Sequence, residues 1–450
     1  MELKFHTKPW AHQIAAIKYL MDKNCGALFL DMGSGKTKII VDLIVNKGFK
    51  RVLILAPKKV CRVWEPQIAM HAPNEKIQVI NVSNLPGSSK SGAILKNLTE
   101  ANFDGIEVVI NNYDSVWREP FKQFVLKRKW DAVICDESHR IKTPGSKISK
   151  FMAQLGKTVP NRFIATGTPL AQSPLDIYGQ YKFLDPKVFG TSYNDFKQRY
   201  ANWVLAVGGF LMLDKKNPYK NLDELTEKML SRAFTAKVDL DLPEIQEIIV
   251  PYDMSKIAQK HYKELQKEGC LMLESGAVDP GNVLALITRL QQLTSGYLPT
   301  EGGVEEIDKS RQEVLYEILE GINEPVVVFA KFKKDIKNII SVAKSLGKHV
   351  AEVSGRVDEF DSWKDVLVVQ IAAGAEGIDF TKARYAIYYT LSHALWQYKQ
   401  SKKRLHRPGQ RRNVKFYYLM AQIPGTKTID ERIYKALMDN ENLIESLLEV

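Results

Sequence analysis

Short apolar runs rich in β-branched residues alternate with helix-length amphipathic segments along most of this chain. Six of these runs lie in the first half, at Gly26–Leu30, Val52–Ala56, Gln78–Val82, Val108–Ile110, Ala132–Cys135 and Phe163–Thr166. Five more lie towards the end, at Pro325–Phe329, His349–Ser354, Val366–Ile371, Ala386–Thr390 and Val414–Leu419. Strands that alternate with helices form βαβ units around a parallel sheet. The pattern therefore predicts an α/β fold with two parallel-sheet lobes.

The segment between the two blocks has a different pattern, because aromatic residues recur there at helical spacing from Pro169 to about Arg232. We therefore predict a first lobe over residues 1–168, a helical insertion and linker over 169–234, and a second lobe over 235–450. The second lobe is expected to end in a helix over Thr428–Leu448, where Ile429, Ile433 and Leu437 recur every four residues.

Composition excludes several classes of protein. Of the 450 residues, 45% are hydrophobic and 26% are charged, which is typical of a folded soluble protein. No apolar run approaches the roughly 20 residues of a membrane helix, and the N-terminus lacks a secretory pattern. We therefore expect an intracellular protein of the cytoplasm or nucleoid, or of the host cytoplasm if it is viral, with no membrane partner.

Net charge indicates the kind of partner, and cysteine spacing bears on zinc sites and disulfides. Lysine and arginine number 64 against 52 acidic residues, a net charge of +12 that favours an anionic partner such as nucleic acid. The four cysteines lie far apart, without a CxxC pair, so neither a zinc site nor a disulfide framework is indicated.

The segment Gly33-Ser-Gly35-Lys36-Thr37 follows an apolar strand and precedes a helical pattern, which is the context of a phosphate-binding loop. Glycines let backbone N–H groups close on phosphate, Lys36 supplies charge, and the Thr37 hydroxyl is placed to hold Mg²⁺. Leu30 stands where the full GxxxxGK[ST] pattern has its first glycine. An ordinary glycine turn is the alternative.

Three further groups could complete such a site. Asp136 and Glu137 follow an apolar strand, where Asp136 could hold Mg²⁺ and Glu137 could activate water. The alternative is that the two acids only form a turn or cap a helix. Thr166-Gly-Thr168-Pro follows another strand and could be a simple turn. Arg404 and Arg407 share one helix face and could act as arginine fingers or form a solvated basic surface.

Taken in order, these elements resemble the Swi/Snf-like group of DNA-dependent ATPases within helicase superfamily two, in a compact form without chromatin-reading domains, as in phage or bacterial members. The resemblance begins at PWAHQ, which is similar to the adenine-reading glutamine motif, and continues through DMGSGKT, DESH and TGTPLAQSPLDIYGQYKFLDP. The segment Phe234–Leu265 and the later sequence QSKKRLHRPGQ are the most specific parts of it.

This resemblance implies two RecA-like lobes with ATP and Mg²⁺ in the cleft between them and duplex DNA across both. It implies that Gln13 reads adenine, that Gly33, Gly35, Lys36 and Thr37 bind phosphate and metal, and that Asp136 and Glu137 run hydrolysis. Gln400, Arg404 and Arg407 would complete the site from the second lobe. Coupling of ATP to DNA would involve Thr166, Thr168, Gly377 and Asp379.

Asp379 stands where the family usually carries asparagine. DNA contacts are expected at loop positions the family uses for backbone phosphates, namely Lys58, Lys59, Asn112, Tyr113, Lys331 and Arg356. For each lysine or arginine the alternative is an ordinary surface charge. Trp64 and Trp396 are interpreted as core aromatics rather than base-stacking platforms.

Three functions follow from these patterns. The first is an ATP-dependent translocase on double-stranded or branched DNA, without sequence preference and with a possible replication or repair protein as partner. The second is a strand-separating helicase or an RNA-stimulated ATPase, because the core motifs are shared. The third is a DNA-binding assembly module whose ATP site acts as a switch.

Overall fold

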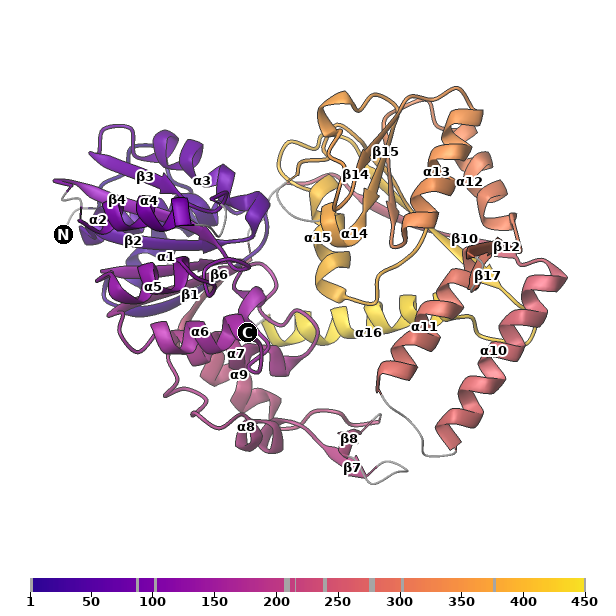
Figure 1. Cartoon of the computed structure of the whole chain (residues 1–450), viewed down its shortest axis with the longest axis horizontal. Coiled ribbons are helices and arrows are strands. Elements are labelled where there is room, and N and C mark those ends of the chain that lie inside the picture. Colours follow the sequence, from indigo (N-terminus) through magenta and orange to yellow (C-terminus); the bar gives the residue numbers. More distant parts are fainter. Residues whose placement is uncertain are drawn as a thin grey trace. The chain divides into compact units, whose positions relative to one another are not determined.

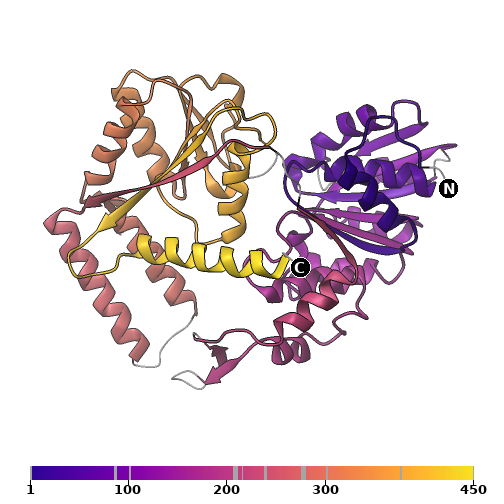
Figure 2. The ribbon, with the colours of Figure 1, turned by 180° about the vertical axis from the view of Figure 1, so that it is seen from behind.

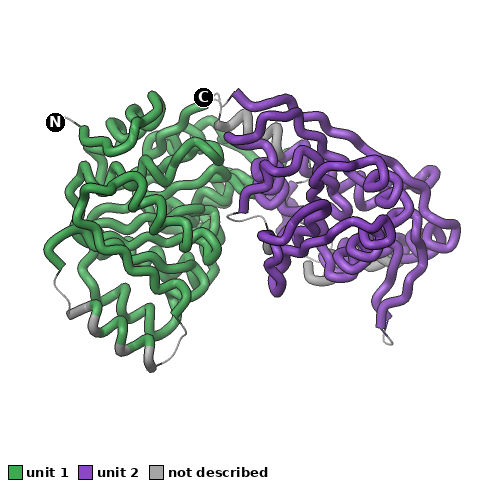
Figure 3. Tube along the Cα trace, turned by 90° about the horizontal axis from the view of Figure 1, so that it is seen from above, with its two compact units in different colours: residues 1–202, 216–240, 444–450 green, residues 203–215, 241–443 purple. Residues whose placement is uncertain are grey.

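The computed structural model describes residues 3–85, 89–100, 103–205, 211–214, 216–237, 241–274, 280–300, 303–374 and 378–448. The chain divides into two compact units (Figure 3). The first unit comprises Met1–Asn202, Lys216–Leu240 and Ile444–Val450, and the second comprises Trp203–Lys215 and Asp241–Leu443. Each unit is described by itself below.

The first unit is built on a seven-stranded parallel sheet in the order β3-β4-β2-β5-β6-β1-β9 (Figure 1). Its strands are β1 (Cys25–Leu30), β2 (Arg51–Ala56), β3 (Ile77–Asn81), β4 (Ile106–Asn112), β5 (Ala132–Asp136), β6 (Asn161–Thr166) and β9 (Ala233–Ala236). The six runs predicted in the first half correspond to β1–β6. The central strands are buried almost throughout because helices cover the sheet.

Helices connect these strands. They are α1 (Ala11–Met21), α2 (Lys36–Lys47), α3 (Lys58–His71), α4 (Ser89–Glu100), α5 (Phe121–Lys127), α6 (Lys147–Leu155), α7 (Ile177–Leu184), α8 (Tyr193–Tyr200) and α9 (Leu222–Leu230), with short 3-10 turns η1 (Ser138–Ile141) and η2 (Pro174–Asp176). The predicted helical insertion at 169–234 contains α7, α8 and α9, but it also holds the hairpin β7 (Trp203–Leu205) and β8 (Leu211–Leu213).

Strand order in this sheet positions the predicted site. β5, β6 and β1 are neighbours, although β6 follows β1 in the chain by more than a hundred residues. All three run parallel, so their carboxyl ends lie at the same edge. The loops after them carry the phosphate-loop motif, the Asp136–Glu137 pair and the Thr166–Pro169 motif.

The second unit contains a six-stranded parallel sheet in the order β10-β17-β16-β13-β15-β14. Its strands are β10 (Ile245–Asp253), β13 (Val326–Ala330), β14 (Val350–Val353), β15 (Val366–Gln370), β16 (Tyr385–Tyr388) and β17 (Val414–Gln422), and β11 (Tyr297–Thr300) pairs with β12 (Gly303–Glu306) as a hairpin. The five runs predicted in the second half are β13–β17. β10, which those runs did not include, lies beside β17 over nine residue pairs (Figure 2).

The helices of this unit are α10 (Lys256–Glu274), α11 (Pro280–Thr294), α12 (Ser310–Glu320), α13 (Lys333–Ser345), α14 (Ile371–Gly374), α15 (Leu395–Leu405) and α16 (Ile429–Leu448), with a 3-10 turn η3 (Phe360–Ser362). The helix predicted at Thr428–Leu448 is therefore present as α16, and its apolar residues Ile429, Ile433 and Leu437 are buried. The prediction of an α/β fold with two parallel sheets is confirmed.

A buried ion pair ties the elements of the second unit together. Arg311 of α12 bonds to the Asp430 carboxylate at the start of α16. The same guanidinium donates to Tyr252 Oη of β10 at 2.6 Å and to the Tyr389 carbonyl after β16 at 2.7 Å. A buried charge in this environment is stabilised only when it is paired and hydrogen-bonded, and Arg311 satisfies both conditions.

Within the described part of the chain, no helix has both the length and the apolar character that crossing a bilayer requires.

Candidate active site

The phosphate-loop motif forms the turn between β1 and α2. Gly33 and Gly35 have φ angles of 83° and 77°, which glycine adopts without steric cost. α2 begins at Lys36, whose ammonium group donates to the carbonyls of Leu30 and Asp31, both at 2.9 Å. Thr37 lies in the first turn of α2. The turn thus presents a helix N-terminus and a lysine, the features that bind phosphate.

Gln13 of α1 packs directly on this loop. Its side chain is buried, its Nε2 donates to the Ser34 carbonyl at 3.3 Å, and its Oε1 accepts from the Trp10 N–H at 2.9 Å. A Cβ on Gly35 would lie only 2.2 Å from Gln13 Nε2, and the φ of Gly35 is 77°, so the contact and the backbone together favour glycine. The structure therefore brings Gln13 and the phosphate loop together, while adenine recognition by Gln13 stays a prediction.

Asp136 and Glu137 lie at the carboxyl end of β5, where both are buried. The Glu137 N–H donates to Asp136 Oδ1 at 3.0 Å. Burial raises the pKa of Asp136 and the Glu137 carboxylate raises it further, whereas the Lys36 ammonium opposes the change. The Lys36 ammonium therefore favours the charged form of Asp136.

The backbone of Glu137 is in the left-handed region, with a φ of 53°. A non-glycine residue holds this conformation only where its surroundings impose it, and such residues concentrate at functional sites.

The loop after β6 holds the Glu137 side chain. The Thr166 hydroxyl donates to Glu137 Oε2 at 3.0 Å, and the Thr168 N–H donates to Thr166 Oγ1 at 3.1 Å. A Cβ on Gly167 would lie 3.3 Å from the Leu30 carbonyl, so this loop also adjoins the phosphate loop. Thr166 thus contacts the predicted catalytic residue Glu137, and Thr168 bonds to Thr166.

His139 is a site residue that the sequence analysis did not select. Its Nδ1 lies 3.2 Å from Thr166 Oγ1 and 3.3 Å from Glu137 Oε2, and the ring is buried. It was visible in the sequence as the last residue of DESH, but nothing in the local pattern showed that it faces Glu137.

Three predicted residues of the second unit lie on α15 or just after it. Gln400 and Arg404 are buried on α15. The prediction that Arg404 and Arg407 share one helix face is wrong, because α15 ends at Leu405 and Arg407 follows it. Arg407 Nε lies 3.7 Å from Asp379 Oδ2. Gly377 falls outside the described residues. The part played by these side chains at the nucleotide stays a prediction.

The candidate DNA contacts differ in exposure. Lys58 and Arg356 are exposed, and Lys59 is half-buried. Lys331 donates to Gln291 Oε1 at 2.6 Å, and burial lowers its pKa. Their contacts with DNA stay predictions.

Asn112 and Tyr113 are buried, which differs from the exposed position expected of phosphate contacts. The physical reason is that both side chains bond inside the first unit. Asn112 Nδ2 donates to the Ser83 carbonyl at 2.9 Å, and Tyr113 Oη donates to the Asp136 carbonyl at 2.7 Å. Tyr113 therefore supports the end of β5, where Asp136 and Glu137 lie.

The two tryptophans considered for base stacking also differ in exposure. Trp64 is part of the hydrophobic core of the first unit and Trp396 is half-buried.

Family models match most of the chain. The model of the SNF2-related domain matches residues 12–296, and the model of the helicase conserved C-terminal domain matches residues 310–409. The first match alone covers more than half of the chain and includes every site loop of the first unit. The chain belongs to the SNF2-related family. The family resemblance predicted from the motifs is therefore confirmed.

The curated relatives of this SNF2-related chain share about a quarter of their aligned residues with it. It is 24% identical over 454 residues to an uncharacterized ATP-dependent helicase of Mycoplasma pneumoniae, covering 96% of this chain and 41% of that protein. It is also 24% identical to the ISWI chromatin-remodeling complex ATPase ISW1 of Saccharomyces cerevisiae, covering 96% of this chain and 40% of that protein. The chain thus spans about two fifths of the length of these two relatives.

A solved structure, the Sulfolobus solfataricus SWI2/SNF2 ATPase core in complex with dsDNA, is 21% identical. That match covers 100% of this chain and 95% of the solved chain, with a TM-score of 0.45.

The donor set of this SNF2-related site suits Mg²⁺. The Thr37 hydroxyl and the Asp136 carboxylate are hard oxygen ligands, and Mg²⁺ characteristically binds through one or two protein oxygens together with substrate phosphates. The described residues contain no group of three or more histidine, cysteine or acidic side chains that could enclose a metal by themselves. The residues present fit a metal shared with a nucleotide.

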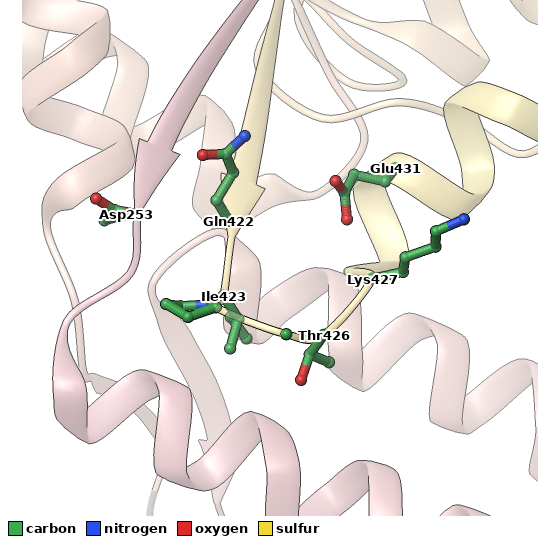
Figure 4. A pocket seen from close by; sticks show the side chains of 8 residues that line it. Asp253, Gln422, Ile423, Thr426, Lys427 and Glu431 are labelled. Carbon is green, nitrogen blue, oxygen red and sulfur yellow. The ribbon is translucent and has the colours of Figure 1, made fainter.

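A hollow of about 470 Å³ lies elsewhere, at the turn between β17 and α16 in the second unit (Figure 4). It is lined by Asp253, Gln422, Ile423, Pro424, Gly425, Thr426, Lys427 and Glu431. None of the predicted site residues lines it.

Proposed function

We propose that this protein hydrolyses ATP to ADP and phosphate and uses the cycle to translocate along double-stranded DNA. The observation that carries the proposal is the meeting of three loops at one edge of the first sheet. There hydrogen bonds link Asp136, Glu137 and Thr166, and the Lys36 ammonium lowers the pKa of Asp136. A phosphate loop, a buried acid pair and a hydroxyl that orients one acid are the parts that phosphoryl transfer to water requires.

Each residue has a distinct role in this proposal. Gly33, Gly35 and Lys36 bind the phosphates, and Gln13 reads the adenine. Glu137 orients and deprotonates the attacking water, with its carboxylate held by Thr166 and His139. Thr37 and Asp136 would hold Mg²⁺, which supplies neutralisation of the charge on the phosphate oxygens.

The second unit supplies cationic side chains in this proposal. Arg404 and Arg407 act as arginine fingers on transition-state charge, and Gln400 contributes to nucleotide binding. Thr166, Thr168, Gly377 and Asp379 couple hydrolysis to DNA.

The proposed DNA contact is electrostatic and sequence-independent. The net charge of +12 and the exposure of Lys58 and Arg356 support contacts to backbone phosphates, and Lys59 and Lys331 are proposed to add to them. Such contacts give affinity without base readout, as a motor that moves along any duplex requires. A replication or repair protein is the partner class proposed, with action in the cytoplasm or nucleoid.

Steady-state ATP hydrolysis tests the enzymatic part. The purified chain is assayed at one fixed salt concentration without nucleic acid, and then with duplex DNA, single-stranded DNA, forked DNA and RNA. We expect strong stimulation by duplex or forked DNA. Stimulation by RNA alone would favour the RNA-stimulated ATPase, and no turnover under any condition would favour the switch-like module.

Two variants tie the activity to this site. Lys36→Ala and Glu137→Gln are each expected to abolish turnover while the circular dichroism spectrum stays that of a folded protein. Full activity in either variant would refute the assignment. Triplex displacement then tests translocation, and separation of a tailed duplex in a gel would instead support a strand-separating helicase.

A further inference from the structure

Helix α7 packs at backbone distance against the turn that follows the catalytic acids. A Cβ on Gly179 would lie 2.4 Å from each of the carbonyl oxygens of Ile141 and Lys142, so only glycine allows this approach. At the same contact, Lys142 Nζ donates to Asp176 Oδ2 at 3.0 Å. The position of the catalytic turn is therefore coupled to the position of α7.

Gln180 of α7 joins the two loops that hold Glu137. Its side chain has no exposed surface. Its Oε1 accepts from the Ser138 hydroxyl at 2.7 Å, and its Nε2 donates to the Pro169 carbonyl at 2.6 Å. Ser138 directly follows Glu137, and Pro169 directly follows Thr168. One side chain thus bridges the loop that carries the acid and the loop that carries its hydroxyl donor.

Every polar atom of the Gln180 amide is hydrogen-bonded, because Nε2 also donates to the Asp176 carbonyl at 3.1 Å. A buried polar network whose members are all satisfied fixes relative geometry, whereas removal of one member leaves unpaired polar atoms. Glu137 needs such support, because its left-handed backbone is held only by surrounding contacts.

We propose that Gln180 is a positioning residue for ATP hydrolysis. It keeps the turn after Glu137 in register with the Thr166–Pro169 loop, so that the Glu137 carboxylate stays on the Thr166 hydroxyl. Gln180 contacts neither Glu137 nor the phosphate loop in any hydrogen bond of the described residues, and it acts through Ser138 and Pro169. This role rests on the proposed function, in which Glu137 activates the attacking water.

The first test replaces Gln180 by leucine, which has a similar size but cannot bridge the loops. We expect kcat to fall by about tenfold or more while the KM for ATP changes by less than about threefold, since geometry at the reacting water is lost and phosphate binding is retained. Tyr178→Phe is the matched control. Tyr178 lies on the same helix with a buried hydroxyl that has no hydrogen-bond partner among the described residues, so kcat should stay at the wild-type value.

Two further variants separate positioning from stability. Ser138→Ala removes the hydrogen bond to Gln180 Oε1 and leaves the bond to Pro169 in place. We therefore expect a smaller fall in kcat, of about threefold. The double variant Gln180→Leu/Ser138→Ala removes the hydroxyl that Gln180→Leu leaves unpaired, so its thermal stability should recover in part. Its turnover should remain low. Recovery of turnover together with stability would show a merely structural role and overturn the proposal, as would a wild-type kcat in Gln180→Leu.

Hydrogen exchange provides a readout that needs no turnover. In the nucleotide-free protein, the amides of 137–141 should exchange faster in Gln180→Leu than in the wild type and in Tyr178→Phe. Unchanged exchange would overturn the proposal even if hydrolysis is observed. Absence of hydrolysis in the wild type, with faster exchange in the variant, would locate the failure in the proposed function and uphold the positioning contact.

Discussion

Arg407 Nε lies 3.7 Å from Asp379 Oδ2, so the second unit pairs a candidate arginine finger with the acid that stands where the family usually carries asparagine. The other carboxylate oxygen accepts from the Thr381 N–H at 2.8 Å. The Asp379 carboxylate therefore stabilises the backbone turn at 379–381 and neutralises part of the charge of Arg407. The unusual acid has a partner within its own unit, which gives a physical reason for its presence in a basic region.

Replacing Asp379 separates these two contributions. Asp379→Asn keeps an oxygen that can accept from Thr381 and removes the charge, so we expect DNA-stimulated kcat to stay within about threefold of the wild type, because a part-exposed ion pair contributes little. Asp379→Ala loses both contacts and should reduce kcat by about tenfold. The measurement is kcat at saturating ATP and DNA. Equal losses in both variants would show that the charge, not the turn, is what matters.

The contacts among Glu137, Thr166 and His139 predict that Thr166 and His139 act as a unit. We expect His139→Ala and Thr166→Val each to lower kcat by about tenfold, because each removes a group that contacts Glu137 Oε2. The double variant should lose little more than either single variant, which corresponds to a coupling energy of about 1.4 kcal/mol. Multiplicative losses would show that the two side chains act independently.

Gly35→Ala is expected to weaken ATP binding by more than about tenfold. A side chain at a φ of 77° costs about 1 to 2 kcal/mol, and the new Cβ would meet Gln13 Nε2. Binding of a fluorescent ATP analogue measures the effect. Gly48→Ala is the control, since its φ is 65° and no atom lies within 4 Å of its Cβ position. It should lower stability without changing affinity, and an equal affinity loss there would refute the local explanation.

The Arg311–Asp430 pair predicts a large stability effect. Asp430→Asn leaves the buried guanidinium without its counter-charge and should lower the free energy of unfolding by about 3 to 5 kcal/mol. Urea denaturation followed by fluorescence measures this. Lys76→Ala breaks the exposed pair with Asp104, at 3.4 Å, and should change stability little. Similar effects of the two variants would contradict the buried-pair argument.

The buried carboxyl group of Asp335 on α13 predicts that folding stability depends on pH. Burial raises its pKa from 3.8 to about 6, against the opposing effects of the Thr390 hydroxyl and Arg311. Between these values the folded state retains a proton that the unfolded state loses, so the contribution of Asp335 to stability falls as pH rises from about 4 to about 6. Asp335→Asn lacks this titration. Between about pH 4 and pH 6 its free energy of unfolding should therefore rise relative to that of the wild type, by up to roughly 3 kcal/mol. Urea denaturation of both proteins at several pH values tests this, and a constant difference would contradict it.

Local sequence pattern predicts the apolar, buried strands of both sheets but not the short or partly exposed ones. β2 and β13 are runs of apolar residues buried on both faces, and such runs are visible in any sequence. β9 and β10 were not predicted as strands. β9 has only four residues, and β10 has a partly exposed, mixed composition, so the hydrogen bonds that form them come from β1 and β17 rather than from local preference.

By itself, the sequence determined the α/β class, the order of most strands along the chain, the family and the residues of the phosphate loop and acid pair. These features depend on residue type and on spacing over a few positions. Tertiary structure alone decided that Tyr113 is buried beneath Asp136, that His139 faces Glu137, that Asp379 pairs with Arg407 and that Gln180 bridges Ser138 and Pro169. Each of these contacts joins separate segments of the chain or depends on a turn that local spacing does not predict, because neighbours in a parallel sheet are set by crossover connections rather than by chain order.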